Sequence, residues 1–438
     1  MKKRETIGIL QFGCAKNLVD MELMLGLITK AGYSYSLNPD DPKIKTVIIN
    51  TCSFICDAEK ESVSAIIDMI SKGKKIIITG CLAQKHQKEL QKLLPEVNGF
   101  IGTCDYDKIV EALECSAKNK KFSCISNTPN YEYKEDIKRE QITVGSSSYI
   151  KIAEGCYYNC GYCVIPKLRG KYKSRKMECI IQEAQELANK GVSEIILIAQ
   201  DTTSYGLDLY KKPMLAELLT ELNKIENLNW IRIMYAYPTN FDEKLMDAIN
   251  SLDKVVKYID IPLQHSHLDV LKRMKRPSID YRSFIKKIRK KIKNVAIRTT
   301  FIVGYPGETE EEYQDLYDFI KDMRFDKAGV FEYSREKNTY AYDLKPQIKA
   351  NIKRKRKNAL MKLQKNISLE INKNCQNKTI QCIIEEIHSD GTIVARSYKD
   401  APEVDGLVYI KSDEYLTPGD IVDVKITKAT SYDLYGII

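Results

Sequence analysis

The sequence has no long hydrophobic run, and nothing near its amino terminus resembles an export signal. The apolar stretch nearest that end covers only residues 7–10, contains Gly8 and follows the charged Lys2, Lys3 and Arg4. A signal peptide needs an apolar core of about 7–15 residues, and a membrane-spanning helix needs about 20. We therefore expect neither segment, no membrane partner and a cytoplasmic location.

The chain also lacks the cysteine pattern of a disulfide-stabilised protein. Its 13 cysteines are an odd number and gather in short motifs, whereas a disulfide framework spreads an even number through a small domain. This pattern favours metal binding in a reducing compartment. The chain has 438 residues, of which 43% are hydrophobic, so it is too long for one ordinary core and is predicted to form two or three domains.

The densest cysteine motif lacks a fourth cysteine nearby. Cys156, Cys160 and Cys163 form a C-x3-C-x2-C triplet. The next cysteine, Cys179, comes after a basic loop and lies within a helical pattern. A structural zinc site closes its tetrahedron with four protein ligands, whereas a [4Fe-4S] cluster held by three thiolates keeps one iron open. The triplet therefore favours an iron-sulfur cluster, with a zinc ribbon as the alternative.

The cysteine motifs resemble those of a known family. The triplet, with Tyr162 just before its last cysteine, resembles the radical S-adenosylmethionine (SAM) signature. Upstream stand Gly-Cys-Ala-Lys-Asn around Cys14, Asn-Thr-Cys-Ser-Phe around Cys52 and Thr-Gly-Cys-Leu around Cys81. In this order they resemble the amino-terminal domain of the radical SAM methylthiotransferases. The resemblance covers essentially the whole chain and implies a cluster at each cysteine set.

Residues 1–117 are predicted to form a small parallel α/β domain, because strand-like runs alternate with helix-like stretches. The runs are residues 7–12, 46–50 and 75–79. Cys14, Cys52 and Cys81 each stand at or just after the end of a run. Ligands gather at the carboxyl edge of open α/β sheets, so the three cysteines could converge. Any one of them alone reads more simply as a buried thiol.

The central part of the chain is predicted to be a partial (β/α)6 barrel. A polar linker over residues 118–141 precedes it, and strands alternate with helices through residues 142–370. The six strand candidates are residues 149–153, 194–199, 230–235, 256–261, 295–303 and 328–333. In such barrels the reactive centre lies at the carboxyl ends of the strands. The cysteine triplet follows the first strand, which agrees with this position.

The resemblance implies SAM contacts at Tyr162, Gln200, Arg298 and Gly304. Gln200 opens a polar Gln-Asp-Thr-Thr segment, which suits either a polar ligand or a helix cap. Gly304 opens Gly-Tyr-Pro-Gly-Glu-Thr, where glycines would allow close approach of adenine, or simply form a strand-to-helix turn capped by Thr309. Arg298 could hold the SAM carboxylate or pair with a structural acid.

Three further features have simpler interpretations. His265, one of only four histidines, is predicted to be a satisfied structural residue. The basic run at residues 353–357 is predicted to be a solvated helix face, with contact to ribosomal RNA as the alternative. Asn338 occupies a place where we expect glycine from the family, which puts the local turn in doubt.

Residues 371–438 are predicted to form a small all-β, OB-like module that resembles the TRAM domain. Residues 379–438 contain five Lys/Arg and eleven Asp/Glu, a net charge of −6, although the whole chain is +10. An RNA-binding module should be basic, whereas an acidic one should attract a basic protein. Residues 397–406 also resemble the corresponding segment of the ribosomal-protein branch of the family.

The family resemblance implies a methylthiotransferase that modifies the β-carbon of an aspartate in small-subunit ribosomal protein S-twelve. It implies two [4Fe-4S] clusters, SAM as radical source and methyl donor, and an electron donor. We assign no catalytic side chain beyond the cluster ligands. One alternative is methylthiolation of transfer RNA adenosine, which a basic carboxyl-terminal surface would favour. Another is a non-catalytic iron-sulfur protein that binds RNA and does not cleave SAM.

Overall fold

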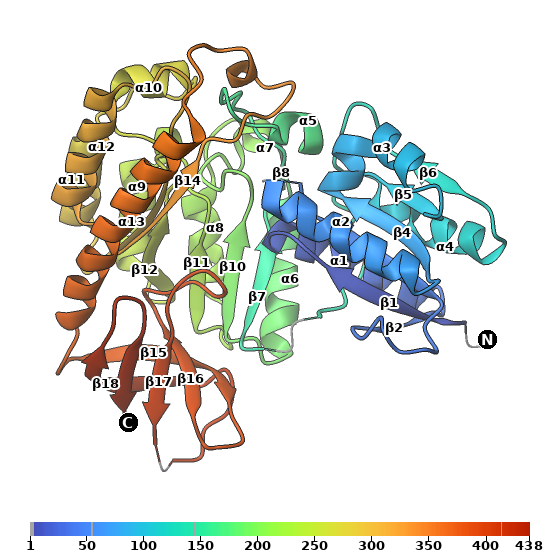
Figure 1. Ribbon diagram of the computed structural model, residues 1–438. Coiled ribbons are helices and arrows are strands. Elements are labelled where there is room, and N and C mark those ends of the chain that lie inside the picture. The colour runs from blue at the N-terminus through green and yellow to red at the C-terminus, as the bar shows by residue number, and fades with distance from the viewer. Residues whose placement is uncertain (1–3, 54–55, 136, 143–144, 413) are drawn as a thin grey trace. The chain divides into compact units, whose positions relative to one another are not determined.

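The computed structural model describes residues 4–53, 56–135, 137–142, 145–412 and 414–438 (Figure 1). The chain divides into two compact units. The first unit comprises Met1–Thr143, Glu154–Tyr158 and Val164–Lys173, and the second comprises Val144–Ala153, Asn159–Cys163 and Ser174–Ile438. No helix among the described residues has the length and apolar content needed to cross a bilayer.

The first unit is built on a six-stranded parallel sheet of order β2-β1-β3-β4-β5-β6. Its strands are β1 (Thr6–Gln11), β2 (Ser34–Ser36), β3 (Thr46–Thr51), β4 (Lys75–Gly80), β5 (Gly99–Ile101) and β6 (Phe122–Cys124). Its helices are α1 (Ala15–Lys30), α2 (Cys56–Ser71), α3 (Cys81–Leu93), η1 (Tyr106–Lys108), α4 (Ile109–Ala117) and α5 (Ile165–Arg169). The parallel α/β prediction is confirmed.

The central strands of this sheet are apolar because they are buried on both faces. Every residue of β3 is buried, and Val47 and Ile49 share one core cluster with Ile76 and Ile78 of β4. Covered parallel strands of this kind are rich in β-branched residues and do not alternate with polar ones. The buried strands hold their carboxyl ends in register.

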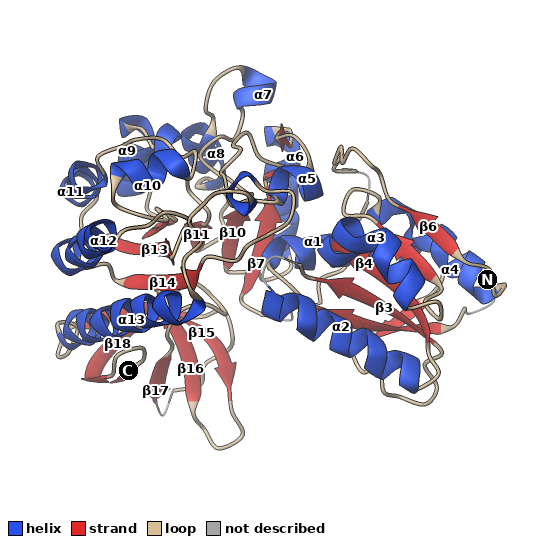
Figure 2. Cartoon of the chain, turned by 45° about the horizontal axis from the view of Figure 1, so that its top comes forward, coloured by secondary structure: helices blue, strands red, loops and turns tan. Residues whose placement is uncertain are grey.

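The second unit contains a six-stranded parallel sheet of order β14-β13-β12-β11-β10-β7. Its strands are β7 (Ser147–Lys151), β10 (Glu194–Ile198), β11 (Trp230–Ile233), β12 (Val255–Asp260), β13 (Ala296–Val303) and β14 (Lys327–Glu332). Each begins within two residues of its predicted start. Sequential strand order with helical crossovers confirms the partial barrel (Figure 2, strands red and helices blue).

Helices and short elements connect these strands. They are α6 (Met177–Asn189), α7 (Leu207–Tyr210), α8 (Leu215–Leu222), η2 (Pro238–Asn240), α9 (Glu243–Ser251), α10 (Leu268–Arg273), α11 (Tyr281–Lys291), α12 (Glu310–Met323) and η3 (Tyr340–Tyr342). The two-residue strands β8 (Ala153–Glu154) and β9 (Lys173–Ser174) flank the segment that carries the cysteine triplet. Helix α13 (Ala350–Lys373) follows the last strand and packs along β14.

The carboxyl-terminal module is a closed five-stranded barrel of order β15-β16-β17-β19-β18 (Figure 1, red). Its strands are β15 (Thr379–Ile387), β16 (Ile393–Ser397), β17 (Val408–Lys411), β18 (Ile421–Ala429) and β19 (Leu434–Ile437). Val424 and Ile426 point into its core while their neighbours on β18 face outward, as the two-residue period of a strand requires. The predicted small all-β module is confirmed.

A buried ionic network joins this module to the amino-terminal ends of the sheet strands. Glu194, the first residue of β10, accepts from Arg232 Nε at 2.7 Å and from Arg396 Nη2 at 2.5 Å. Arg396 lies on β16 and also pairs with Glu385 at 2.7 Å. The Arg396–Glu194 pair ties the C-terminal barrel to the sheet, and the other two pairs hold its two partners in place.

The turn around Asn338 keeps the conformation that a glycine would favour. Asn338 has a φ of +66°. Asparagine is among the few residues other than glycine that adopt this left-handed region readily. The turn is therefore retained despite the departure from the expected residue.

Candidate metal centres

The structure brings Cys14, Cys52 and Cys81 to one edge of the first sheet. Gln11 is in register with Asn50, and Thr51 with Gly80. Cys52 and Cys81 directly follow β3 and β4, and Cys14 follows β1 after two residues. The three strands are adjacent, so their carboxyl ends meet. We call these three cysteines the first centre.

Asparagine side chains brace the strand ends that carry the first centre. Asn50 Nδ2 donates to Gln11 Oε1 at 2.9 Å and to the carbonyl of Asn17 at 2.7 Å. Asn17 Nδ2 donates to the carbonyl of Thr51 at 3.0 Å. These bonds connect β1, β3 and the first turn of α1. The cysteine-bearing loops therefore start from a rigid base.

Positive charge also surrounds the first centre. Arg169 is buried, and its Nη2 lies 3.7 Å from Cys81 Sγ. Desolvation opposes the change, but the charges of Lys16 and Arg169 lower the pKa of the Cys14 thiol. Burial raises the pKa of Cys81, and Arg169 acts against this rise.

The donor set of the first centre suits an iron-sulfur cluster. Cys14 precedes the first residue of α1 and Cys81 begins α3, so two of the thiols lie at helix amino termini. Helix amino termini and nearby cations stabilise thiolates, the form that binds iron. Together with Cys52 these two cysteines supply three thiols, the number that leaves one iron of a [4Fe-4S] cluster open.

The second centre is the triplet Cys156, Cys160 and Cys163. In the first unit, Cys156 N–H donates to the carbonyl of Gly170 at 3.3 Å, and Tyr158 N–H lies 3.4 Å from Cys156 Sγ. Gly155 has a φ of +74°, and a Cβ there would lie 2.1 Å from the carbonyl oxygen of Lys171. Only glycine fits immediately before Cys156.

Backbone bonds fix the rest of the triplet within the second unit. Cys163 N–H donates to the carbonyl of Cys160 at 2.9 Å. Gly161 N–H donates to the carbonyl of Met274 at 2.8 Å, and the carbonyl of Gly161 accepts from Ala341 N–H at 2.7 Å. The loop is thus held on both sides at its central glycine. Three cysteines on so short a loop fit a cluster with one open iron.

Arg276 is a site residue that no sequence motif indicated. Its Nη1 lies 3.9 Å from Cys160 Sγ and 3.4 Å from Tyr162 Oη, and its guanidinium lies over the ring of Tyr237 at 4.5 Å. Its Nη2 donates to the carbonyl of Pro262 at 2.8 Å. Arg276 stands in a Lys-Arg-Pro turn, where a surface charge is the ordinary expectation. Only the fold reveals that it is buried beside the second centre.

The four expected SAM contacts do not all lie at the same end of the sheet. Tyr162 belongs to the second centre's loop, Gln200 follows β10 after one residue, and Gly304 directly follows β13. Arg298 is the third residue of β13, about 20 Å along the strand from Gly304 at about 3.3 Å per residue. Arg298 therefore lies at the opposite end.

Arg298 takes the structural role that the sequence left open. Its Nη1 donates to Asp260 Oδ1 at 3.0 Å, and its Nε lies 3.4 Å from Asp405 Oδ1 of the C-terminal barrel. Two carboxylates already satisfy the guanidinium, so we do not propose it as a contact for the SAM carboxylate.

The Gly304 loop is held by a buried acid and by α13. Glu308 Oε2 accepts from Gly304 N–H at 2.9 Å, and Glu308 Oε1 pairs with Arg356 at 2.5 Å. Gly304 has a φ of +71°, and a Cβ there would lie 2.3 Å from Lys353 Cγ. Much of the space that glycine leaves is therefore filled by the stem of Lys353.

The basic run at residues 353–357 is not one uniform solvated face, so that prediction is wrong in part. Arg356 is buried against Glu308, and Lys353 Nζ donates to the carbonyl of Tyr333 at 2.7 Å. Arg354 and Lys355 are exposed. Residues three apart share a helix face, so the helical period divides the run into docked and solvated cations.

His265 is fully buried but only half satisfied by hydrogen bonds. Its Nδ1 accepts from His267 N–H at 3.1 Å. Its Nε2 has no hydrogen-bond partner among the described residues and lies 3.7 Å from Glu308 Oε2. The prediction of a satisfied structural histidine is therefore correct for one nitrogen only.

The burial of His265 predicts a pH-dependent stability. Burial lowers the pKa of His265 to about 3, against about 6.5 in an unfolded chain. Below about pH 6.5 the unfolded chain binds a proton that the folded chain does not bind until about pH 3. This residue should therefore remove about 2 kcal/mol of stability between pH 7 and pH 5. Denaturant unfolding at both pH values measures the loss.

A His265→Gln variant should flatten this dependence on pH, because glutamine does not titrate. The exposed His388 provides the control, and His388→Gln should keep the slope of the parent protein. An unchanged slope in His265→Gln would contradict the assignment.

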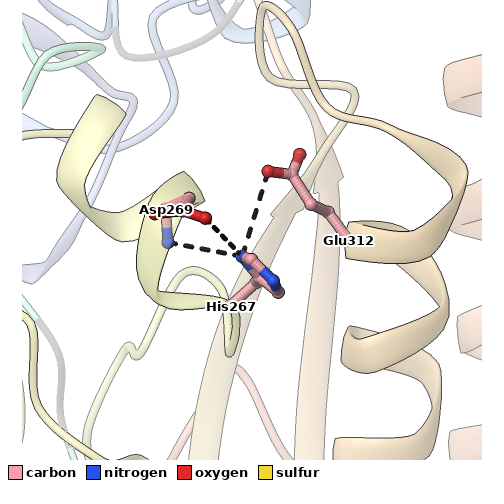
Figure 3. Close-up of side chains that lie close together, drawn as sticks. All are labelled: His267, Asp269 and Glu312. Carbon is pink, nitrogen blue, oxygen red and sulfur yellow. Dashed lines mark hydrogen bonds and ion pairs between the residues drawn. The ribbon is translucent and has the colours of Figure 1, made fainter.

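His267, Asp269 and Glu312 lie close enough to resemble a metal site (Figure 3). Their contacts have another explanation. His267 Nδ1 accepts from Asp269 N–H at 3.3 Å and caps α10. Glu312 pairs with Arg273 at 2.6 Å and completes the capping box of α12 with Thr309. A cation already neutralises Glu312, so we assign no metal here.

Comparison with known families agrees with this architecture. Residues 6–102 match the uncharacterized protein family UPF0004, residues 150–320 match the Radical SAM superfamily, and residues 378–438 match the TRAM domain. Among solved structures, the radical SAM methyltransferase TsrM from Kitasatospora setae has a TM-score of 0.58 at 13% identity, covering 85% of this chain and 78% of that one. The similarity to TsrM concerns the fold alone.

Curated relatives match over the full length. The chain is 51% identical to the ribosomal protein uS12 methylthiotransferase RimO of Caldanaerobacter subterraneus, over 98% of this chain and 99% of the relative. It is 49% identical to that of Thermoanaerobacter sp., over 99% of both, and 44% identical to that of Synechocystis sp., over 100% of this chain and 98% of the relative. The chain therefore belongs to the RimO family of radical SAM methylthiotransferases.

Proposed function

We propose that this chain attaches a methylthio group to the β-carbon of an aspartate in ribosomal protein uS12. The observation that carries the proposal is the full-length identity of 51% to a RimO enzyme. The two cysteine centres support it, because sulfur insertion at an unactivated carbon requires a cofactor able to break a carbon-hydrogen bond homolytically.

We propose Cys156, Cys160 and Cys163 as the ligands of the radical SAM cluster, and the first centre as the ligands of an auxiliary cluster. When bound, a three-thiolate [4Fe-4S] cluster supplies an open iron and an electron for reductive cleavage of SAM, and the auxiliary cluster supplies sulfur. The electron must come from a separate donor. SAM serves in this proposal as both radical source and methyl donor.

The protein's contribution is to position and to shield. Arg276 holds Tyr162 beside Cys160 and places a fixed positive charge at the second centre. Glu308 holds the Gly304 amide, so the loop after β13 keeps one conformation. Gln200 and Gly304 lie at the carboxyl edge of the sheet, the same edge at which β7 ends before the cysteine triplet. We propose them as SAM contacts. A preorganised site of this kind requires little rearrangement when a ligand binds.

The negative charge of the C-terminal barrel supports a basic protein as substrate, but fewer acidic residues contribute to its surface than the sequence suggested. Glu385 pairs with Arg396, Asp400 with Lys327 and Asp405 with Arg298, so these acids serve the fold. Within residues 379–438, the exposed acids among the described residues are Glu386, Asp390, Glu403, Glu414 and Asp423, and the exposed lysines are Lys411, Lys425 and Lys428. The exposed surface remains acidic, which favours a basic partner.

A competition experiment tests the proposed function. After anaerobic reconstitution with iron, sulfide, SAM and a strong reductant, uS12 and transfer RNA are offered together and both are analysed by mass spectrometry. We expect a methylthio mass increment on uS12 alone. An increment on the transfer RNA alone would contradict the proposed substrate, while no SAM cleavage would contradict the enzyme class.

Charge reversal tests the acidic surface. Glu386→Lys combined with Asp423→Lys should raise the KM for uS12 severalfold and leave uncoupled SAM cleavage unchanged, because these exposed residues lie on the C-terminal barrel. Glu186→Lys on α6 is the matched control and should leave the KM unchanged. Equal KM values in all three proteins would contradict this role.

A further inference from the structure

Arg169 is an unusually placed cation in the first unit. It is the last residue of α5 and is 2% exposed. Its Nη1 donates to Asp20 Oδ2 at 2.6 Å and to Glu154 Oε2 at 3.1 Å. Its Nη2 donates to Asn17 Oδ1 and lies 3.7 Å from Cys81 Sγ. A buried arginine thus divides its donors between two carboxylates and the edge that carries the first centre.

Apolar packing holds α5 at this edge. Val164 and Leu168 form a small buried cluster with Cys81. The carbonyl of Leu168 accepts from Thr103 Oγ1 at 2.5 Å. The helix that ends in Arg169 is therefore fixed beside Cys81 by contacts that do not involve the guanidinium. This packing places the Arg169 side chain next to the Cys81 sulfur.

The contacts of Arg169 require a planar fork. Asp20 comes from α1 and Glu154 precedes Cys156 by two residues, while the second nitrogen faces Asn17 and Cys81. A lysine offers one compact ammonium on a flexible stem and cannot serve both sides in one plane. The two carboxylates orient the fork, so that one of its nitrogens is directed to the sulfur.

We propose that Arg169 is a positioning residue for the first centre, where it holds Cys81 and makes the reduction potential of the bound cluster less negative. The inference rests on the proposed function, because it assumes a cluster on Cys14, Cys52 and Cys81. Reduction adds negative charge to a cluster, and a buried cation beside a ligand sulfur favours the added charge. Hydrogen bonds to the sulfurs are among the factors that set iron-sulfur potentials.

The same side chain brackets the second centre in sequence. Glu154 stands two residues before Cys156, and Arg169 stands six residues after Cys163. The Arg169–Glu154 ion pair therefore joins the two ends of the segment that carries the triplet. The Nη2 atom of Arg169 contacts Cys81 of the first centre. Loss of the fork should disturb Cys81 first, because that sulfur contacts the guanidinium directly.

The test uses the full chain with Cys156, Cys160 and Cys163 all changed to alanine, so that any remaining cluster belongs to the first centre. After anaerobic reconstitution, iron content, the electron paramagnetic resonance spectrum of the reduced protein and the reduction potential are measured. Arg169→Lys keeps the charge and loses the fork. Arg169→Met with Asp20→Asn removes the cation and one of its two counter-charges, which limits misfolding.

The structure predicts that Arg169→Lys alters the resonance line shape and that Arg169→Met with Asp20→Asn shifts the potential to more negative values. Both should release iron to a chelator about 10–100-fold faster, because losing an outer contact of a metal ligand commonly lowers metal affinity by that factor. Arg139→Lys is the control, since Arg139 is another buried arginine, paired with Glu22 on α1. It should behave as the parent protein does.

The outcomes separate this inference from the proposed function. A parent protein that binds a cluster, together with Arg169 variants that match it in potential, line shape and iron release, would overturn the role of Arg169 alone. A parent protein that binds no cluster at the first centre, although Arg169 is intact, would overturn the proposed auxiliary site and this inference together. Far-ultraviolet circular dichroism of each variant confirms folding.

Discussion

Replacing Glu194 with alanine is expected to lower the free energy of unfolding by about 3–5 kcal/mol. Glu194 is completely buried between Arg232 and Arg396, and the change would leave two guanidinium groups without their shared carboxylate. Burial opposes ionisation of Glu194, but the two arginines lower its pKa to about 2. Because Arg396 belongs to the C-terminal barrel, this barrel should loosen from the sheet first.

Urea unfolding measures the loss, and limited proteolysis after α13 reports loosening of the barrel. The folded pKa of Glu194 lies below its unfolded value of about 4.3. Its contribution is therefore complete above about pH 4.5 and is lost as pH falls toward 2. The difference between the parent protein and Glu194→Ala should shrink in the same range.

Glu386→Ala is the matched control for this prediction. Glu386 lies on the exposed face of β15, with a side chain that is 70% exposed, and its loss should change stability by less than about 0.5 kcal/mol. Glu194→Gln should fall between the two, since it keeps the volume and one acceptor. If Glu194→Ala were no more harmful than Glu386→Ala, the ionic network would not hold the barrel.

Replacing Cys156 and Cys14 one at a time should separate two losses of activity. Cys156→Ala is expected to reduce 5'-deoxyadenosine formation to background, because the second centre would lose one of only three ligands. Cys14→Ala is expected to keep SAM cleavage and lose the methylthio product on uS12, because it removes a ligand of the first centre alone. Chromatography of the nucleoside and mass spectrometry of uS12 read the two losses separately.

Cysteines outside the two centres serve as controls. Cys124 ends β6, at the far side of the first sheet, and Cys179 lies on α6 of the second unit. Cys124→Ala and Cys179→Ala should keep both activities. Equal loss of SAM cleavage in the Cys14 and Cys156 variants would mean that the two cysteine sets do not hold independent clusters.

Local patterns in the sequence were enough to predict the three-part architecture. Strand-like runs alternating with helical ones predicted both parallel sheets, since hydrophobic period and length distinguish strands from helices. Turn dipeptides between short strands predicted the C-terminal barrel. Predicted strand ends differ from the observed ones by up to three residues, because hydrogen bonding and not hydrophobicity decides where a strand stops.

Long-range pairing of charges could not be read from the sequence. Arg169 is 149 residues from Asp20, and Arg396 is 202 residues from Glu194. An arginine in a basic stretch of sequence looks the same whether it is solvated, as Arg354 is, or buried, as Arg276 is. Asp400 and Asp405, which seemed to add to the negative surface of the C-terminal module, instead pair with Lys327 and Arg298 of the sheet.

The sequence by itself determined which segments become strands and which cysteines are proposed as metal ligands, because hydrophobic period and cysteine spacing are local properties of the chain. Only the tertiary structure decided which charges face water and which are buried. Arg298 lies at the end of β13 opposite the proposed SAM contact Gly304, and Arg169 lies against Cys81. The physical reason is that a buried charge is tolerated only beside a partner, and the fold alone brings such partners together.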